Sequence, residues 1–313
     1  MLMKDRKSPS RRASSESRYS LMEFMAEFPD DEACLQQLWR DRYSPDGVHA
    51  DCSKCKTARV FERYATTQQR QSWTCTACGH HLHPTAGTIY HKSSTSLHLW
   101  FYAMYLMTST RCGISAKQLE RELGVTYKTA WRMFHQIRSL LEEDIRDLAG
   151  TIETDETFLG GKEKNKHANK RFGAGRGAVG KQPVWGALER GGRVVARVVP
   201  DTTKRTVLPH VIERVLPRST VYTDEAAIYD PLTGMGYGHK RVHHAAKVYV
   251  QGDVHVNTLE GFWSLVKRGI GGVYHSVSTK HLQSYVSEYA WRYNHRNDRQ
   301  AQFNSLLLRA ARP

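Results

Sequence analysis

The segment GTIETDETFLGG, residues 150–161, marks the point where the pattern of the chain changes. It is predicted to form one strand, and the residues after it alternate between strand and helix patterns. They predict two strands joined by a Gly-Gly turn over 182–201, a helix over 204–217, and a strand that leads into a helix over 219–229. The order β, β, β, α, β, α predicts an α/β domain that begins with this first strand.

Two aspartates lie on strands of this region. Asp155 is inside the first strand, and Asp224 is at the end of the strand that follows the helix. Ends of strands in open sheets are where functional sites collect. Two glutamates near Asp155 should point in different directions. Glu153 lies on the same strand face as Asp155 and could approach the same site, whereas Glu156 should point to the opposite face.

The segment HVNTLEGFWSLVKRGI, residues 255–270, is predicted to form a helix. Its buried stripe would consist of Phe262, Leu265, Val266, Gly269 and Ile270. Glu260 and Lys267 then lie on nearly one azimuth, opposite the stripe. In a structural interpretation, Asn257 caps the helix, Glu260 completes a capping box and Lys267 is a surface lysine. In a functional interpretation, Glu260 and Lys267 belong to a site.

Asp155, Asp224 and Glu260 together form an ordered set of three acids. Three carboxylates that converge repel one another unless cations lie between them, and hard oxygen ligands suit Mg²⁺ or Mn²⁺. Two such ions about 4 Å apart can activate an attacking water or hydroxyl and stabilise the departing oxygen of a phosphodiester. Lys267 would then offer an ammonium group to a DNA phosphate beside the cleaved bond.

Four of the six cysteines stand in two CxxC knuckles, CSKC at 52–55 and CTAC at 75–78. The residues between the knuckles suit β-hairpins, and two knuckles on hairpins are typical of a zinc ribbon. The predicted ligands of one structural Zn²⁺ are Cys52, Cys55, Cys75 and Cys78. A redox pair or a set of free thiols is the alternative interpretation.

Residues 115–141 predict two helices, with a break at Gly124 and a cap for the second helix at Thr126. This is the pattern of a helix-turn-helix, whose second helix meets DNA with its first turns. The residues predicted to face DNA from that helix are Lys128, Thr129 and Arg132. A plain helical pair is the alternative.

The chain has 313 residues and a formal net charge of +15, which favours a polyanionic partner, nucleic acid before an acidic membrane. Its longest apolar run, residues 97–107, is shorter than the roughly 20 residues that cross a bilayer. No secretory signal is evident, so we expect a soluble, cytoplasmic protein without membrane association. Two basic segments cannot pack: 1–20 is expected to be a disordered arm, and 160–181 a loop that closes on phosphates.

Three motifs that follow the knuckles in order carry a resemblance to a known family. They are IETDETFLGGK at 152–162, YTDEAAIY at 222–229 and HVNTLEGFWSLVKRGIGGVYH at 255–275. With the knuckles, they resemble the DDE transposases of bacterial insertion sequences, specifically the ISXO-like group with an N-terminal zinc ribbon. The resemblance covers residues 28–297. It implies an RNase H-like catalytic domain with a mixed five-stranded sheet and flanking helices, preceded by a zinc ribbon and a helix-turn-helix segment.

The resemblance also implies roles for individual residues. Asp155 and Asp224 match the first two catalytic acids and Glu260 the third, and all three would be ligands of two Mg²⁺ or Mn²⁺ ions. Asn257, three residues before Glu260, is the alternative third residue. The residues implied to contact DNA beside these acids are Lys267 and Arg268.

The implied activity is DNA transposition. The enzyme would bind terminal inverted repeats, cleave DNA at the element ends by metal-dependent hydrolysis, and join the 3' ends to target DNA by transesterification. A homo-oligomer would hold both ends. Two alternatives are an RNase H-like nuclease that cuts without joining, and a DNA-binding regulator that uses only the ribbon and the helix-turn-helix.

The expected organisation has five segments. In order they are a basic arm (1–20), an N-terminal helix with the zinc ribbon (21–92), the helix-turn-helix segment (93–148), the RNase H-like catalytic domain (149–300) and a C-terminal tail (301–313).

Overall fold

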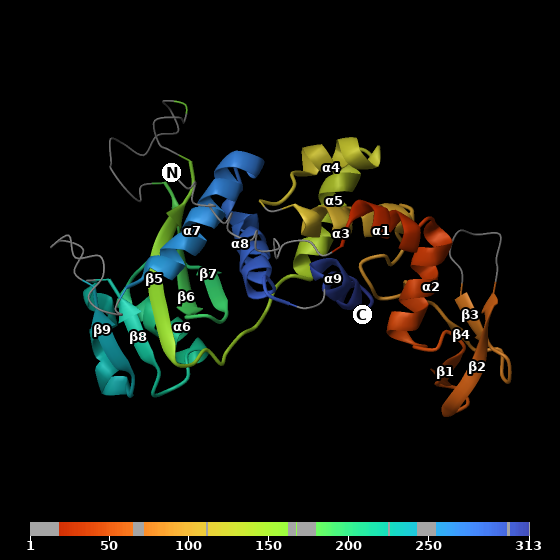
Figure 1. The fold of residues 1–313 in the computed structure, drawn as a ribbon, viewed down its shortest axis with the longest axis horizontal. Coiled ribbons are helices and arrows are strands. Elements are labelled where there is room, and N and C mark those ends of the chain that lie inside the picture. Colours follow the sequence, from red (N-terminus) through yellow and green to blue (C-terminus); the bar gives the residue numbers. More distant parts are fainter. Residues whose placement is uncertain are drawn as a thin grey trace, which may run out of the picture. The chain divides into compact units, whose positions relative to one another are not determined.

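The structure is a computed structural model (Figure 1) that describes residues 19–64, 72–110, 112–161, 167, 180–224, 226–242, 255–298 and 301–312. Nearly all of the basic arm expected at 1–20, and of the basic loop expected at 160–181, lies outside these residues. The chain forms two compact units. One comprises the residues up to Arg111 together with Arg296–Arg312, and the other comprises Cys112–His295.

The first unit contains a small antiparallel sheet with strand order β1-β2-β3-β4. Its strands are β1 (His49–Cys52), β2 (Thr57–Tyr64), β3 (Ser72–Cys75) and β4 (His81–Leu82). The knuckle cysteines lie at the ends of β1 and β3 and in the turns that follow these strands. This is the pair of hairpin-borne knuckles that the sequence predicts.

Helix α2 (Asp31–Arg42) packs against this sheet. The ring of Trp39 stacks on Trp73 of β3, with centroids 4.6 Å apart and planes 2° from parallel. Leu35 and Phe61 complete the apolar core around the two rings. A large aromatic pair thus gives this small sheet a core on the side of the helix.

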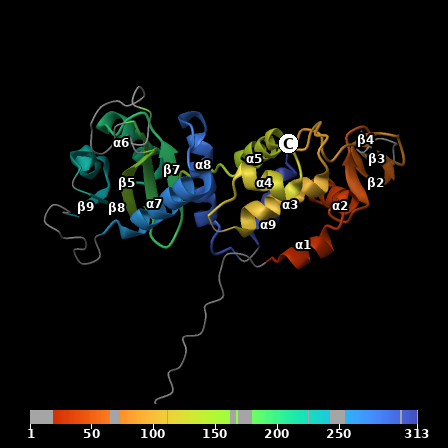
Figure 2. The same ribbon diagram turned by 90° about the horizontal axis from the view of Figure 1, so that it is seen from above.

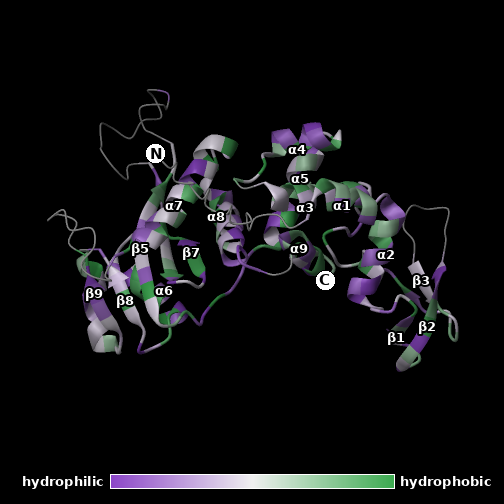
Figure 3. Ribbon diagram, in the orientation of Figure 1, coloured by the Kyte–Doolittle hydropathy of each residue, from purple (hydrophilic) through white to green (hydrophobic). Residues whose placement is uncertain are grey.

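Among the described residues, the first unit also contains the helices α1 (Leu21–Glu27), α3 (Leu97–Ser109) and α9 (Gln302–Ala310). The longest apolar run of the sequence forms α3, which is more apolar than most other helices (Figure 3) and has most of its side chains buried. None of the helices in the described part of the chain combines the length and apolar content needed to cross a membrane.

Helix α9 lies in the segment expected to be a C-terminal tail. Its Phe303 is 2% exposed and packs against Phe24 and Phe28 at the start of the chain and Tyr105 of α3. The tail expectation is therefore corrected, because residues 302–310 form a helix that contributes to the core of the N-terminal unit.

The second unit is built on a mixed five-stranded sheet with strand order β7-β6-β5-β8-β9. Its strands are β5 (Thr151–Leu159), β6 (Gln182–Glu189), β7 (Val194–Val198), β8 (Thr220–Thr223) and β9 (Gly238–Arg241). The first three pair antiparallel, whereas β8 and β9 continue the sheet in parallel from β5. The expected α/β fold with a mixed five-stranded sheet is confirmed, and β5 lies at its centre.

Helices cover both faces of this sheet. Helix α6 (Lys204–Arg214) and the 3-10 helix η3 (Ala227–Met235) share a core with one face, and α7 (Asn257–Gly269) and α8 (Thr279–Asn294) share a core with the other. Figure 2 shows α6 and α7 on opposite sides of the strands. A π-helical segment, η5 (Ile270–Tyr274), extends α7. Residues of β5 therefore face α7 or η3 in alternation.

The helix-turn-helix segment belongs to the second unit, together with the sheet. It consists of α4 (Ala116–Leu123) and α5 (Tyr127–Ser139), separated by Gly124 in the left-handed conformation. Arg138 of α5 and Glu288 of α8 form a fully buried ion pair with an Nε–Oε2 distance of 2.7 Å. The segment expected at 93–148 is therefore divided between the two units: residues 93–111 belong to the first unit, and residues from Cys112 onward, with α4 and α5, belong to the unit that contains the five-stranded sheet.

Candidate active site and metal centre

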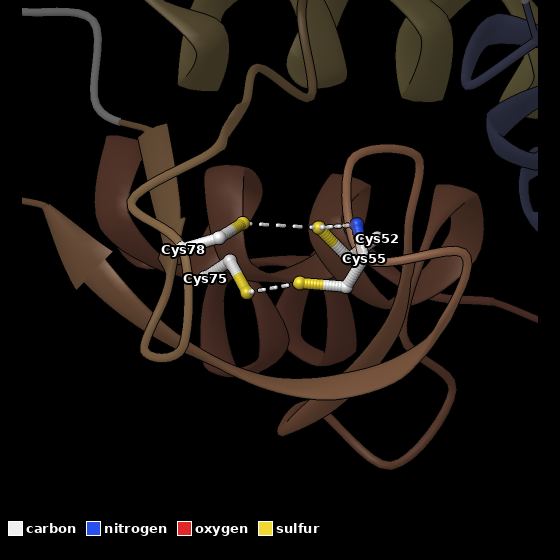
Figure 4. Close-up of side chains that lie close together, drawn as sticks. All are labelled: Cys52, Cys55, Cys75 and Cys78. Carbon is white, nitrogen blue, oxygen red and sulfur yellow. Dashed lines mark hydrogen bonds between the residues drawn. The ribbon is translucent and has the colours of Figure 1, made fainter.

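The four knuckle cysteines point toward one another (Figure 4). The Sγ atoms of Cys52 and Cys78 are 3.5 Å apart, and those of Cys55 and Cys75 are 4.0 Å apart. A tetrahedral ion with metal–sulfur bonds of about 2.3 Å requires sulfur atoms about 3.8 Å apart. Among the residues that the structure describes, this is the one group of three or more His, Cys, Asp or Glu whose ligand atoms all lie within 4.8 Å of one another. The cluster fits a tetrahedral metal ion.

Hydrogen bonds to the sulfur of Cys52 favour its thiolate form. Desolvation acts to raise its pKa, but hydrogen bonds from the Cys55 N–H and from Cys78 outweigh it and lower the pKa to about 7. The thiolate is the form of cysteine that binds metals.

The first candidate acids come from adjacent parallel strands. The register pairs Thr151 with Thr220 and Glu153 with Tyr222. Asp155 lies two residues beyond Glu153 on β5, and Asp224 directly follows the last residue of β8, so both lie at the same end of this strand pair. Burial, followed by the charge of Asp224, raises the pKa of Asp155 to about 6. The two aspartates therefore lie close enough to interact, as expected for a pair at one end of the sheet.

Helix α7 brings Glu260 and Lys267 to Asp155. Residues of β5 and α7 line one cavity of about 520 Å³. Its lining residues are Asp155, Glu156 and Thr157 of β5 and Glu260, Trp263, Ser264, Lys267 and Arg268 of α7. Glu260 raises and Lys267 lowers the pKa of Asp155. Four residues predicted for the site therefore line one cavity: Asp155, Glu260, Lys267 and Arg268. Asp224, directly after β8, raises the pKa of Asp155 by its charge.

The start of α7 differs from the sequence interpretation. Asn257 is the first helical residue, and the N-cap is Val256, which makes no side-chain cap bond. The capping box between Asn257 and Glu260 is therefore wrong. Among the described residues that line the cavity, Glu260 is present and Asn257 is not.

Glu156 points away from α7, as the sequence predicts, because its carboxylate accepts a hydrogen bond from the hydroxyl of Tyr229 on η3. The residue is nevertheless among those that line the cavity. Burial is the largest cause that raises its pKa, to about 7, and Asp155 and Asp224 add to it. Glu156 is thus a fourth carboxylate at the edge of the site.

Comparisons with known proteins extend these observations. Residues 147–294 match the ISXO2-like transposase domain. A relative from Halobacterium salinarum, named as an uncharacterized protein in transposable element ISH50, is 31% identical over 270 residues, which cover 82% of this chain and 87% of the relative. The chain belongs to the ISXO2-like transposase family.

Two further similarities concern smaller parts of this transposase. An uncharacterized transposase-like protein from Haemophilus influenzae is 31% identical over 102 residues, 33% of this chain and 81% of that protein. A pre-cleavage Mos1 transpososome structure covers 63% of this chain and 75% of that chain at 12% identity, with a TM-score of 0.25. The family match itself begins before β5 and ends at the last residue of α8, so it contains all three acids.

The sequence analysis did not identify the close contact between Gly186 and Trp263, a residue that lines the cavity. Gly186 of β6 pairs with Asp155, and a Cβ atom there would lie 2.5 Å from Cζ2 of Trp263. The indole therefore occupies the space that a side chain would fill, directly beside the strand position of Asp155. A glycine inside a strand can signal such a close approach.

The helix-turn-helix of the transposase presents the predicted residues unequally. Lys128 and Arg132 are exposed on α5, whereas Thr129 is half-buried and its N–H and hydroxyl bond Thr126. Sequence analysis did not single out Trp131, which is 39% exposed on the same helix and packs edge-on against His281 of α8. An exposed tryptophan beside two cations suits contact with nucleic acid.

Proposed function

We propose that this transposase binds the terminal inverted repeats of its element, cleaves DNA at the element ends, and joins the freed 3' ends to target DNA by transesterification. The observation that carries the proposal is the cavity in which Asp155 of β5 meets Glu260 and Lys267 of α7. An acid on a central strand, a second acid directly after the next parallel strand and a third on a facing helix would supply the oxygen ligands.

The donor set suits two Mg²⁺ or Mn²⁺ ions held by Asp155, Asp224 and Glu260. All three offer carboxylate oxygens, which hard divalent cations prefer. The raised pKa of Asp155 supports the assignment, because burial and neighbouring acids oppose its ionisation and a bound cation would relieve that opposition. When bound, such ions activate an attacking water or hydroxyl and stabilise the departing oxygen of a phosphodiester.

The cations of α7 would hold the DNA backbone. Lys267 and Arg268 are exposed on the cavity wall, two helical turns beyond Glu260. We assign them to phosphates next to the cleaved bond, so that they fix the scissile phosphate over the acids.

Elements other than β5, β8 and α7 would recognise the DNA sequence. We propose that the four cysteines hold one structural Zn²⁺, and that the zinc ribbon binds the inverted repeats together with α5, through the exposed Lys128 and Arg132 and the half-buried Thr129. The net charge of +15 supports a nucleic acid partner. Because two element ends must be held together, the active form would be a homo-oligomer, acting in the cytoplasm.

A strand-transfer assay with labelled, pre-cut element ends and Mg²⁺ tests this proposal. The wild type should yield joined products, and Asp155→Asn should lose both cleavage and joining while it retains DNA binding. Asp147→Asn is the control, because Asp147 is an exposed acid of the same unit that pairs with Arg193. Cleavage without joined product would favour a nuclease. DNA binding with neither reaction in the wild type would favour a regulator.

A further inference from the structure

Helix α7 has no capping residue of its own. Its first amide groups lack helical partners, as at every helix start, and the N-cap Val256 supplies no side chain to them. The carboxylate of Glu153 on β5 takes this place. Its Oε2 accepts from the N–H groups of Thr258 and Leu259, both at 2.9 Å, and its Oε1 accepts from the hydroxyl of Thr258 at 2.9 Å.

A second set of contacts holds the same carboxylate. Arg190, which directly follows β6, donates from Nε to Oε1 of Glu153 at 2.8 Å. The same guanidinium donates from Nη2 to the carbonyl of His255 at 2.8 Å. One ion pair therefore ties together β5, the turn after β6 and the residues that lead into α7. A negative charge at this point also interacts favourably with the helix dipole.

Glu153 is unsuited to be a metal ligand itself. It is completely buried, and a carboxylate has about four lone-pair positions. Four donors occupy them: the two backbone N–H groups, the Thr258 hydroxyl and Arg190 Nε. The oxygens of Glu153 are thus fully used within the protein, although the residue shares a strand face with Asp155.

The position of Glu153 links the two walls of the cavity. It lies two residues before Asp155 on the same face of β5, and one of its bonds goes to Leu259, the residue before Glu260. One turn further along α7, Trp263 packs into the space left by Gly186, the strand partner of Asp155. The helix is therefore fixed to the sheet on both sides of Glu260.

We propose that Glu153 is a positioning residue for the metal-dependent DNA cleavage proposed above, on which this inference rests. Its buried carboxylate fixes the first turn of α7 against β5 and thereby sets the separation between Asp155 and Glu260. It acts through these two acids and touches neither DNA nor metal. The sequence gives no sign of this role, because Glu153 and Thr258 are 105 residues apart.

Glu153→Gln tests the proposal with almost no change in size. In glutamine, an NH₂ group replaces one of the two carboxylate oxygens, each of which accepts hydrogen bonds in the wild type. At least one hydrogen bond to α7 or to Arg190 is therefore lost. Binding of Mn²⁺ to the full-length protein, followed by electron paramagnetic resonance of the free ion, should weaken about tenfold, as for other residues that orient metal ligands. Hydrogen exchange at the first turn of α7 should accelerate. Glu153→Asp, which keeps the charge, should recover part of the Mn²⁺ affinity.

Glu288→Gln is the matched control, because Glu288 is another fully buried acid of the same unit and pairs with Arg138 and Arg292. It should lower the melting temperature and leave Mn²⁺ binding unchanged. Equal weakening of Mn²⁺ binding in both variants, or wild-type binding in Glu153→Gln, would overturn the positioning role alone. A wild type that binds no Mn²⁺ and shows no metal-dependent cleavage would overturn the proposed function and this role with it.

Discussion

At the scale of single residues, the ionisation of Asp155 sets a measurable dependence of stability on pH. Its pKa of about 6 lies above the usual 3.8 because of burial, Asp224 and Glu260, with Lys267 opposing them. The folded state thus holds the Asp155 proton more tightly than the unfolded state does. Stability therefore falls as pH rises from about 4 to about 6, by at most about 3 kcal/mol, and stays lowered above pH 6.

Asp155→Asn should consequently raise the melting temperature when no divalent ion is added, and the gain should be larger at pH 8 than at pH 5. Thermal melts followed by circular dichroism at the two pH values measure it. Asp144→Asn is the control of opposite sign, because hydrogen bonds from Arg214 and Arg146 lower the pKa of Asp144. That variant should lose stability at pH 8. An equal effect of Asp155→Asn at both pH values would contradict the assigned cause.

A second prediction for single residues concerns Gly186, the strand partner of Asp155. An alanine Cβ at Gly186 would lie 2.5 Å from Trp263 Cζ2 and 3.4 Å from Leu259 Cδ1, so Gly186→Ala should cost about 1 to 3 kcal/mol of unfolding free energy through overpacking. Gly261→Ala is the control. It places a Cβ in open space on α7 and should be neutral or stabilising by up to about 1 kcal/mol. Urea unfolding measures both. Partial rescue of Gly186→Ala by Trp263→Phe is expected, and strict additivity of the two changes would argue against the contact.

At the scale of elements, local patterns predicted the strands and helices of the second unit well. The strands near 150–161 and 182–201, and the helices near 204–217 and 255–270, all form close to the expected positions. Their signals are periodic and lie within each segment. The same holds for the candidate site, since spacing along one helix suffices to place Glu260 and Lys267 on one face.

Features that depend on contacts between distant elements could not be predicted in this way. The first N–H groups of α7 are bonded by Glu153 of β5, and Asn257, the candidate within the segment itself, is not the cap. Strand β9 is only Gly238–Arg241 and has little apolar pattern, so its place at the sheet edge depends on pairing with β8. The attachment of α5 to α8 likewise depends on two charges, Arg138 and Glu288, that lie far apart in the sequence.

The prediction for elements concerns the buried ion pair between Arg138 of α5 and Glu288 of α8. Arg138→Met would leave Glu288 buried with the cation of Arg292 and the hydroxyl of Tyr274 as partners. Loss of one member of a buried pair commonly costs 3 to 5 kcal/mol, and because Arg292 remains we expect about 3 kcal/mol. Urea unfolding of the second unit would show it. Arg121→Met, on the exposed side of α4, should change stability by less than about 0.5 kcal/mol. Similar small changes in both variants would show that the pair adds little to the attachment.

At the scale of the whole molecule, the chain leaves its N-terminal unit at Arg111 and returns to it at Arg296. The second unit, with all three candidate acids, is therefore inserted within the first. The expected division into five consecutive segments does not contain this feature, because a return of the chain has no local signal. The consequence is that the C-terminal helix should stabilise the unit that holds the cysteine cluster.

Phe303 of α9 tests this dependence. It is 2% exposed against Phe24, Phe28 and Tyr105, so Phe303→Ala should cost about 3 to 5 kcal/mol of stability. Hydrogen exchange followed by mass spectrometry should accelerate in α1 and α3 and stay unchanged in β5 and β6, since α9 belongs to the first unit only. Leu308→Ala removes a side chain that is 41% exposed on the same helix and should leave both units unchanged. Faster exchange in β5 and β6 with Phe303→Ala would instead mean that the two units unfold together, and that α9 stabilises the protein as one cooperative body.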